Sequence, residues 1–144
     1  MSAEDNKRVM RRLVEEVWDQ GRLETIDEIY SPDFVSHNPG PSGSGIEALK
    51  QDVLMMRRGF PDLRTVELDL LAEGDKVAAR YWAVGTHKGE IMGAPATDRA
   101  VCMGGISIAR FEDGRIVETW ESFDTAGVLE QIGLVELAGR PERS

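Results

Sequence analysis

Two carboxylates near the C-terminus are the residues in this sequence best suited to moving a proton. Glu121 ends a segment of alternating hydrophobic and polar residues, and Asp124 follows three positions later. Alternation in a β-strand places Val117, Thr119 and Glu121 on one face. If that face lines an apolar cavity, desolvation raises the pKa of Glu121 toward neutrality, which suits general acid–base catalysis. The alternatives are a solvated glutamate at a strand end and, for Asp124, a helix N-cap.

The only histidines, His37 and His87, are the other groups that titrate near neutral pH. His37 lies in a loop rich in Pro and Gly, where functional residues concentrate, and His87 ends a predicted strand. They are far apart in sequence and form no HxH pattern, so we predict no metal site. Each histidine has two possible roles, as a hydrogen-bonded structural residue or as a residue of the pocket. We rank His37 higher and expect it to face a closed cavity.

Motifs of other reaction classes are missing from the sequence. Ser107 belongs to no GxSxG elbow, and the glycines of 40–45 lack the GxxxxGK pattern of a phosphate loop. No flavin or nicotinamide motif is seen, so we predict no cofactor. We favour cross-strand ion pairs for the charged strand residues Arg80, Arg110 and Glu118. Several aromatic residues suit either a wall for a flat ligand or packing in a core or dimer: Trp82, Trp120, Phe111 and Phe123.

Composition excludes several kinds of protein. The 144 residues carry 17 Lys+Arg against 26 Asp+Glu, a formal net charge of −9, which argues against binding nucleic acid or anionic membranes. Hydrophobic residues make up 41%, enough for a core, but no run approaches the ~20 residues of a membrane-spanning helix. The acidic N-terminus does not resemble a signal peptide, and the lone Cys102 excludes an internal disulfide. We therefore expect one cytoplasmic domain, 1–144, with its core at 6–134 and a tail at 135–144.

Hydrophobic periodicity predicts helices first and strands afterwards. Steps of three and four predict helices that end at Gly21, before Ser31-Pro32 and near Pro61. The period then changes to two and predicts four strands, with Gly104-Gly105 as a bulge and Asp113-Gly114 as a hairpin turn. These strands cover 66–70, 77–86, 101–111 and 116–123, and a short helix follows over 125–132. We predict an α+β fold whose three N-terminal helices pack in the concave face of a strongly curved antiparallel or mixed sheet and enclose a ligand cavity.

An ordered set of short motifs covering about residues 6–134 resembles one family, the SnoaL-like polyketide cyclases of the nuclear-transport-factor-2-like superfamily. The motifs are Phe34-Val35-Ser36-His37-Asn38-Pro39, Phe60-Pro61-Asp62-Leu63, Glu73-Gly74-Asp75-Lys76-Val77, Gly85-Thr86-His87-Lys88-Gly89, Gly93-Ala94-Pro95-Ala96-Thr97, Arg110-Phe111-Glu112-Asp113-Gly114, Glu118-Thr119-Trp120 and Gln131-Ile132-Gly133. The resemblance implies a cone-shaped α+β barrel, a homodimer or homotetramer, and no cofactor.

The resemblance also implies an acid/base residue at the pocket end of the last strand. That position is Glu121 here, whereas the aldol cyclases of the family have an aspartate. Ser107 stands where the best-known cyclases have a histidine, and Gly105 where they have a glutamine.

We therefore predict an enzyme that closes a ring in a polyketide-derived, flat aromatic small molecule by cofactor-free aldol-type condensation. The predicted catalytic residues are Glu121, Asp124 and His37, the last as a donor to the developing oxyanion. Predicted substrate contacts are His87, Ser107, Trp82, Phe60, Met103 and Thr119. Two alternatives stay open: another enzyme on the same fold (hydroxylase component, epoxide hydrolase or dehydratase), and a non-catalytic ligand-binding dimer. Apolar residues expected on the outer sheet face predict a dimer contact: Ile106, Ile108 and Trp120.

Overall fold

The computed structural model describes residues 2–38, 40–136 and 138. The elements follow in the order α1 (Ala3–Arg12), η1 (Leu13–Asp19), α2 (Glu24–Ile29), β1 (Tyr30–Ser36), α3 (Ile46–Gly59), β2 (Arg64–Glu73), β3 (Lys76–Thr86), β4 (Ala100–Glu112), β5 (Arg115–Phe123) and α4 (Thr125–Gln131). No helix in this described part of the chain is long and apolar enough to cross a membrane. The predicted tail at 135–144 lies largely outside the described residues, and the domain boundaries stay predictions.

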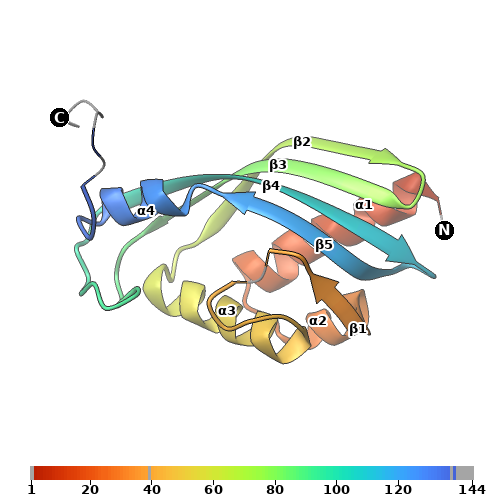
Figure 1. Ribbon diagram of the computed structural model, residues 1–144, viewed down its shortest axis with the longest axis horizontal. Helices are drawn as coiled ribbons and strands as arrows, with labels where there is room; N and C mark the ends of the chain where they lie inside the picture. Colours follow the sequence, from red (N-terminus) through yellow and green to blue (C-terminus); the bar gives the residue numbers. More distant parts are fainter. Residues whose placement is uncertain (1, 39, 137, 139–144) are drawn as a thin grey trace.

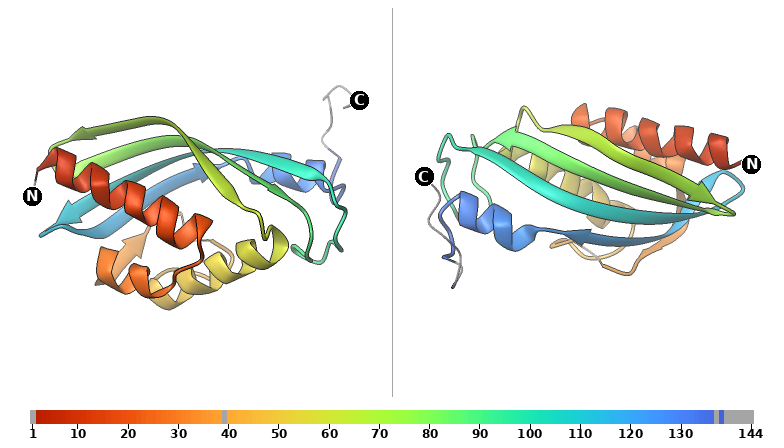
Figure 2. Two further views of the ribbon diagram at one scale, coloured as in Figure 1. Left: turned by 180° about the vertical axis from the view of Figure 1, so that it is seen from behind. Right: turned by 90° about the horizontal axis from the view of Figure 1, so that it is seen from above.

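Five strands form one curved sheet in the order β1-β5-β4-β3-β2. β1 runs parallel to β5, and the other neighbouring strands are antiparallel. The helices α1, α2 and α3 cover the concave face, while α4 lies at one end of the sheet (Figures 1 and 2). β1 and β2 are the edges, so the cone does not close into a complete barrel. The predicted α+β fold is confirmed.

A capping box at Ser2 determines where the N-terminal helix begins. Ser2 accepts a hydrogen bond from the Asp5 N–H, and the Asp5 side chain bonds back to the Ser2 N–H, which is a capping box. The helix continues as the π-helical segment η1, a geometry often found at functional sites. Gly21 follows it with φ +75°, a conformation that costs glycine little.

The core joins the helices to the concave face of the sheet. Its larger cluster includes Val17 of η1, Val53 of α3 and Ile116 of β5, all fully buried. Burying one such side chain stabilises the fold by about 1.5–3 kcal/mol. A second cluster, which includes Phe60 and Val128, packs the end of α3 and α4 around the other end of the sheet.

The strand β1 is absent from the sequence-based expectations. Three residues of its segment are exposed, Pro32 among them, so it shows no alternation of the usual kind. It pairs with β5 far along the chain, and the register shifts between Tyr30 and Val35. An edge strand tolerates proline because one side needs no ladder hydrogen bonds.

The predicted bulge at Gly104-Gly105 is wrong. Both glycines pair in continuous register with β3, and the irregularity lies instead on β5. Phe111 pairs with Ile116 and Arg110 with Glu118, which leaves Val117 without a partner on β4. This extra residue makes Ile116 point inward in place of Val117. The predicted Asp113-Gly114 turn is present, and both residues have positive φ, as such turns require.

Candidate active site

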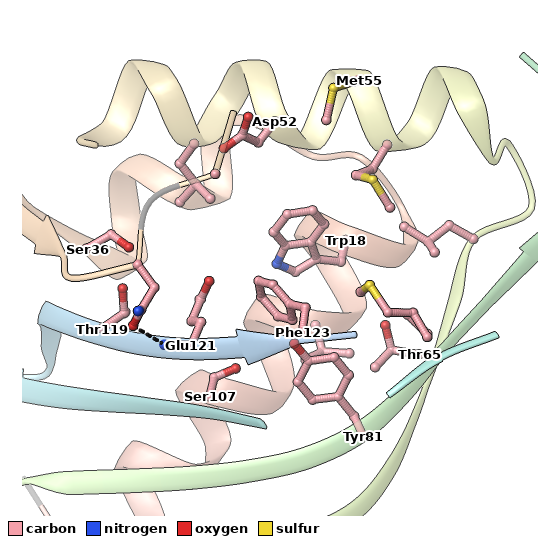
Figure 3. A pocket seen from close by; sticks show the side chains of 18 of the residues that line it. Trp18, Ser36, Asp52, Met55, Thr65, Tyr81, Ser107, Thr119, Glu121 and Phe123 are labelled. Atoms are coloured by element: carbon pink, nitrogen blue, oxygen red, sulfur yellow. Dashed lines mark hydrogen bonds between the residues drawn. The ribbon is translucent and has the colours of Figure 1, made fainter. Parts of the chain in front are cut away.

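A cavity of about 500 Å³ lies between the concave face of the sheet and the helices. Most of its wall is apolar, with methionines and aromatic side chains from α3, η1, β4 and β5 (Figure 3). None of the described residues that line it is Lys, Arg or His. A site of this kind takes a mainly apolar molecule and offers no cation to an anionic group.

Glu121 points into this cavity from β5 (Figure 3). Its backbone N–H donates to Oδ1 of Asn38 at 3.0 Å, which ties β5 to the segment that follows β1. Burial raises the pKa of the Glu121 carboxyl to about 7, and the negative charge of Asp52 adds to the rise. A carboxyl with that pKa can both take up and return a proton near neutral pH.

Asp52 is a second carboxylate in the same cavity, on the opposite wall (Figure 3). It is 8% exposed, and its Oδ1 accepts a hydrogen bond from the Ser42 N–H at 3.1 Å. The sequence analysis missed it. A signal was available, because Asp52 falls on the helical stripe formed by Leu49, Val53 and Met56, where an acid is unexpected.

Tyr81 and Ser107 bring hydroxyl groups to the cavity wall beside Glu121 (Figure 3). Ser107 on β4 lies directly opposite Glu121 on β5. Burial and the charge of Glu121 raise the pKa of Tyr81, and a hydrogen bond with Ser107 opposes this rise. Tyr81 therefore stays protonated at neutral pH.

The prediction that His37 faces the closed cavity is wrong. Ser36 and Asn38 both line the cavity, so the alternation of an extended chain turns His37 between them to the outer face. There its ring stacks on Trp120 with 4.9 Å between centroids, and its Nε2 lies 2.7 Å from Oε2 of Glu118. Hydrogen bonds from His37 and Arg110 lower the pKa of Glu118.

Asp124 does not line the cavity either. It is the N-cap of α4, and its Oδ1 accepts a hydrogen bond from the Gly127 N–H at 2.9 Å. The helix-cap alternative is thus the one that the structure supports.

Residues 8–132 of the chain match the family model of the SnoaL-like polyketide cyclases. The chain belongs to this family.

Curated relatives of this SnoaL-like chain are named as methyl ester cyclases. The nogalonic acid methyl ester cyclase of Streptomyces nogalater is 31% identical over 118 residues, which are 78% of this chain and 87% of the relative. The aklanonic acid methyl ester cyclase DnrD of Streptomyces peucetius is 28% identical over 131 residues, 87% of this chain and 88% of the relative. Among solved structures, TsrD of Streptomyces laurentii has a TM-score of 0.84 at 27% identity, covering 94% of this chain and 99% of that one. IdmH of Streptomyces antibioticus has a TM-score of 0.78 at 34% identity, covering 89% and 98%. The protein is accordingly an enzyme of the cyclase type.

Four of the six predicted substrate contacts of this SnoaL-like cyclase lie at the cavity wall: Phe60, Met103, Ser107 and Thr119. The prediction for Trp82 is wrong, because its neighbours Tyr81 and Ala83 point inward and alternation turns Trp82 outward, where it is 44% exposed.

The sixth predicted contact, His87, is fully buried but does not line the cavity. Its Nδ1 lies 2.9 Å from Oγ1 of Thr97, and its ring packs 5.7 Å from that of Phe60, between centroids. It supports the cavity wall from behind and makes no direct contact with the cavity.

The charged strand residues form cross-strand pairs, as predicted. Arg80 on β3 pairs with Asp69 on β2 at 2.6 Å, and Arg110 on β4 pairs with Glu118 on β5 at 2.6 Å. Both arginines lie outside the cavity.

Proposed function

We propose that this protein closes a ring in a polyketide-derived ester by intramolecular aldol condensation, with Glu121 as the acid/base. The observation that carries the proposal is the carboxyl of Glu121 in an apolar cavity, where burial raises its pKa to about 7. The relatives named as methyl ester cyclases support the substrate class.

The proposed reaction needs only proton transfers and one new carbon–carbon bond. The Glu121 carboxylate takes a proton from a carbon that lies between two carbonyl groups, which leaves an enolate. The enolate carbon attacks a second carbonyl of the same molecule, and the resulting alkoxide takes the proton back from Glu121. No atom enters or leaves, so substrate and product have the same mass. The cavity contributes by orienting the two reacting carbons and excluding water.

The charge of the cavity favours a neutral ester over a free acid. Glu121 and Asp52 are both acidic, and no cation lines the cavity among the described residues. A substrate carboxylate would therefore be repelled and left without a partner. Esterification removes that charge and keeps the carbonyl.

Epoxide hydrolysis, one of the alternatives considered, fits this cavity less well. An enzyme of this superfamily with that activity would want an Asp-Arg-Asp set across the pocket. Arg80 is instead paired with Asp69 outside the cavity, and Asp124 caps α4.

The proposal is tested by incubating the protein with the methyl esters of nogalonic and aklanonic acid. We expect a product of unchanged mass and altered chromatographic retention. Glu121→Gln keeps the size of the side chain and removes the base, so kcat should fall by roughly a hundredfold or more.

Asp124→Asn is the matched control for that substitution, because it makes the same chemical change outside the cavity and keeps the cap. It should leave kcat near the wild-type value. A fully active Glu121→Gln would refute the acid/base role, and binding of both esters without turnover would favour the ligand-binding dimer.

A further inference from the structure

Tyr81 reaches its place in the cavity through a gap left by one glycine. Tyr81 on β3, Gly105 on β4 and Phe123 on β5 are neighbours in register across three strands. A Cβ atom on residue 105 would lie 2.7 Å from Oη of Tyr81 and 2.9 Å from Cδ1 of Phe123. Side chains do not approach a Cβ that closely, so only glycine lets the phenol lie across β4. Glycine at position 105 thus determines where the hydroxyl of Tyr81 lies.

The position of that hydroxyl is next to the proposed acid/base. The side chain of Ser107 interacts with the phenol of Tyr81, and Ser107 lies opposite Glu121 on the adjacent strand. The ring of Phe123 packs at a tilt against the ring of Tyr81, with 6.3 Å between the two centroids. Figure 3 shows Tyr81, Ser107 and Glu121 on the same wall of the cavity.

The chemical state of Tyr81 suits a donor. Burial and the nearby charge of Glu121 both raise its pKa, so the phenol keeps its proton while Glu121 accepts one. No histidine, lysine or arginine lines the cavity among the described residues, and the imidazole of His37 faces outward.

We propose that the hydroxyl of Tyr81 is a catalytic hydrogen-bond donor to the substrate oxygen that becomes negative when Glu121 removes the proton, with Ser107 orienting it. The inference rests on the proposed ring closure. The donor is fixed before the reaction begins, so it stabilises the enolate without reorganising, which lowers the barrier more than it strengthens binding of the neutral substrate.

Tyr81→Phe removes only the hydroxyl and tests the proposal directly. We expect kcat to fall by about a hundredfold, the lower end of the range for loss of one oxyanion donor, while KM changes little. Thermal unfolding of the variant checks that the fold is kept. An unchanged kcat in Tyr81→Phe would overturn the proposal. It would leave the proposed function standing if Glu121→Gln is inactive in the same assay.

Gly105→Ala tests the same hydroxyl without changing it. The added Cβ displaces the phenol, so kcat should fall as in Tyr81→Phe. In the double variant, Gly105→Ala should lower kcat little further, because Tyr81→Phe has already removed the hydroxyl. Gly104→Ala is the matched control, because its Cβ would meet the ring of Trp82 on the outer face at 3.2 Å. It should leave kcat near wild type. If Gly105→Ala and Gly104→Ala lower kcat equally, the gap has no catalytic role and the proposal is wrong.

Discussion

At the scale of single residues, the reactivity of Glu121 follows from where its carboxyl lies. The same side chain in water would be ionised throughout the neutral range. Burial in an apolar cavity and, to a smaller extent, the charge of Asp52 together raise its pKa to about 7. Strand alternation placed Glu121 on one face with Val117 and Thr119, and the family resemblance favoured the cavity for the carboxyl of Glu121. Neither predicted Asp52, because the distance from α3 to β5 is set by packing.

Asp52→Asn should make Glu121 a base at lower pH. Asparagine keeps the acceptor for the Ser42 N–H and removes the negative charge, so the pKa of Glu121 falls. The acidic limb of the kcat/KM profile should therefore move to lower pH, by roughly a few tenths of a pH unit or more.

Asp69→Asn is the control for this prediction, because it removes an exposed aspartate paired with Arg80 outside the cavity. An equal displacement of the profile in both variants would show a general effect of net charge. Either that result or an unmoved profile in Asp52→Asn would contradict the coupling.

At the scale of elements, β1 decides which residues reach the cavity. The segment 36–38 continues its alternation, so Ser36 and Asn38 face inward and His37 faces Trp120. Sequence analysis found the helices and the four antiparallel strands, since their periods and turns are local. It could not find β1, whose pairing with β5 joins distant parts of the chain around Pro32. The misplacement of His37 follows from that one missing strand.

The helix α4 offers a test of the role of Asp124. Asp124→Ala removes the N-cap hydrogen bond to Gly127 and should lower the free energy of unfolding by about 1 kcal/mol. Urea denaturation measures the change. Asp124→Asn, which still caps, should lose little of this stability. A variant Asp124→Ala with wild-type stability and no activity would instead place Asp124 in the chemistry.

At the scale of the whole molecule, the outer face of the sheet carries several exposed apolar side chains. Trp82, Ile106 and Ile108 lie on neighbouring strands there and are 44%, 50% and 36% exposed. Trp120 on the same face is partly covered by His37 and Lys76. Contact with a second copy of the chain would remove this apolar patch from water, which is favourable. We propose a homodimer through this face.

Ile106→Lys should weaken that dimer, because it places a charge in the middle of the patch. Sedimentation velocity should show a dimer for the wild type at micromolar concentration and a monomer for the variant. Leu134→Lys, which changes an exposed aliphatic residue beyond α4, should leave the dimer intact. A wild-type monomer, or a variant that remains dimeric, would contradict this interface.

The central claim is that a buried carboxyl at position 121 takes the substrate proton, and the pH dependence of kcat/KM tests it most directly. The base must be ionised, so activity should rise with pH through about 7, the pKa to which burial raises Glu121. In Glu121→Gln the residual rate should not show this limb. A wild-type profile that is flat across the neutral range, or a Glu121→Gln variant that keeps the same limb, would contradict the account.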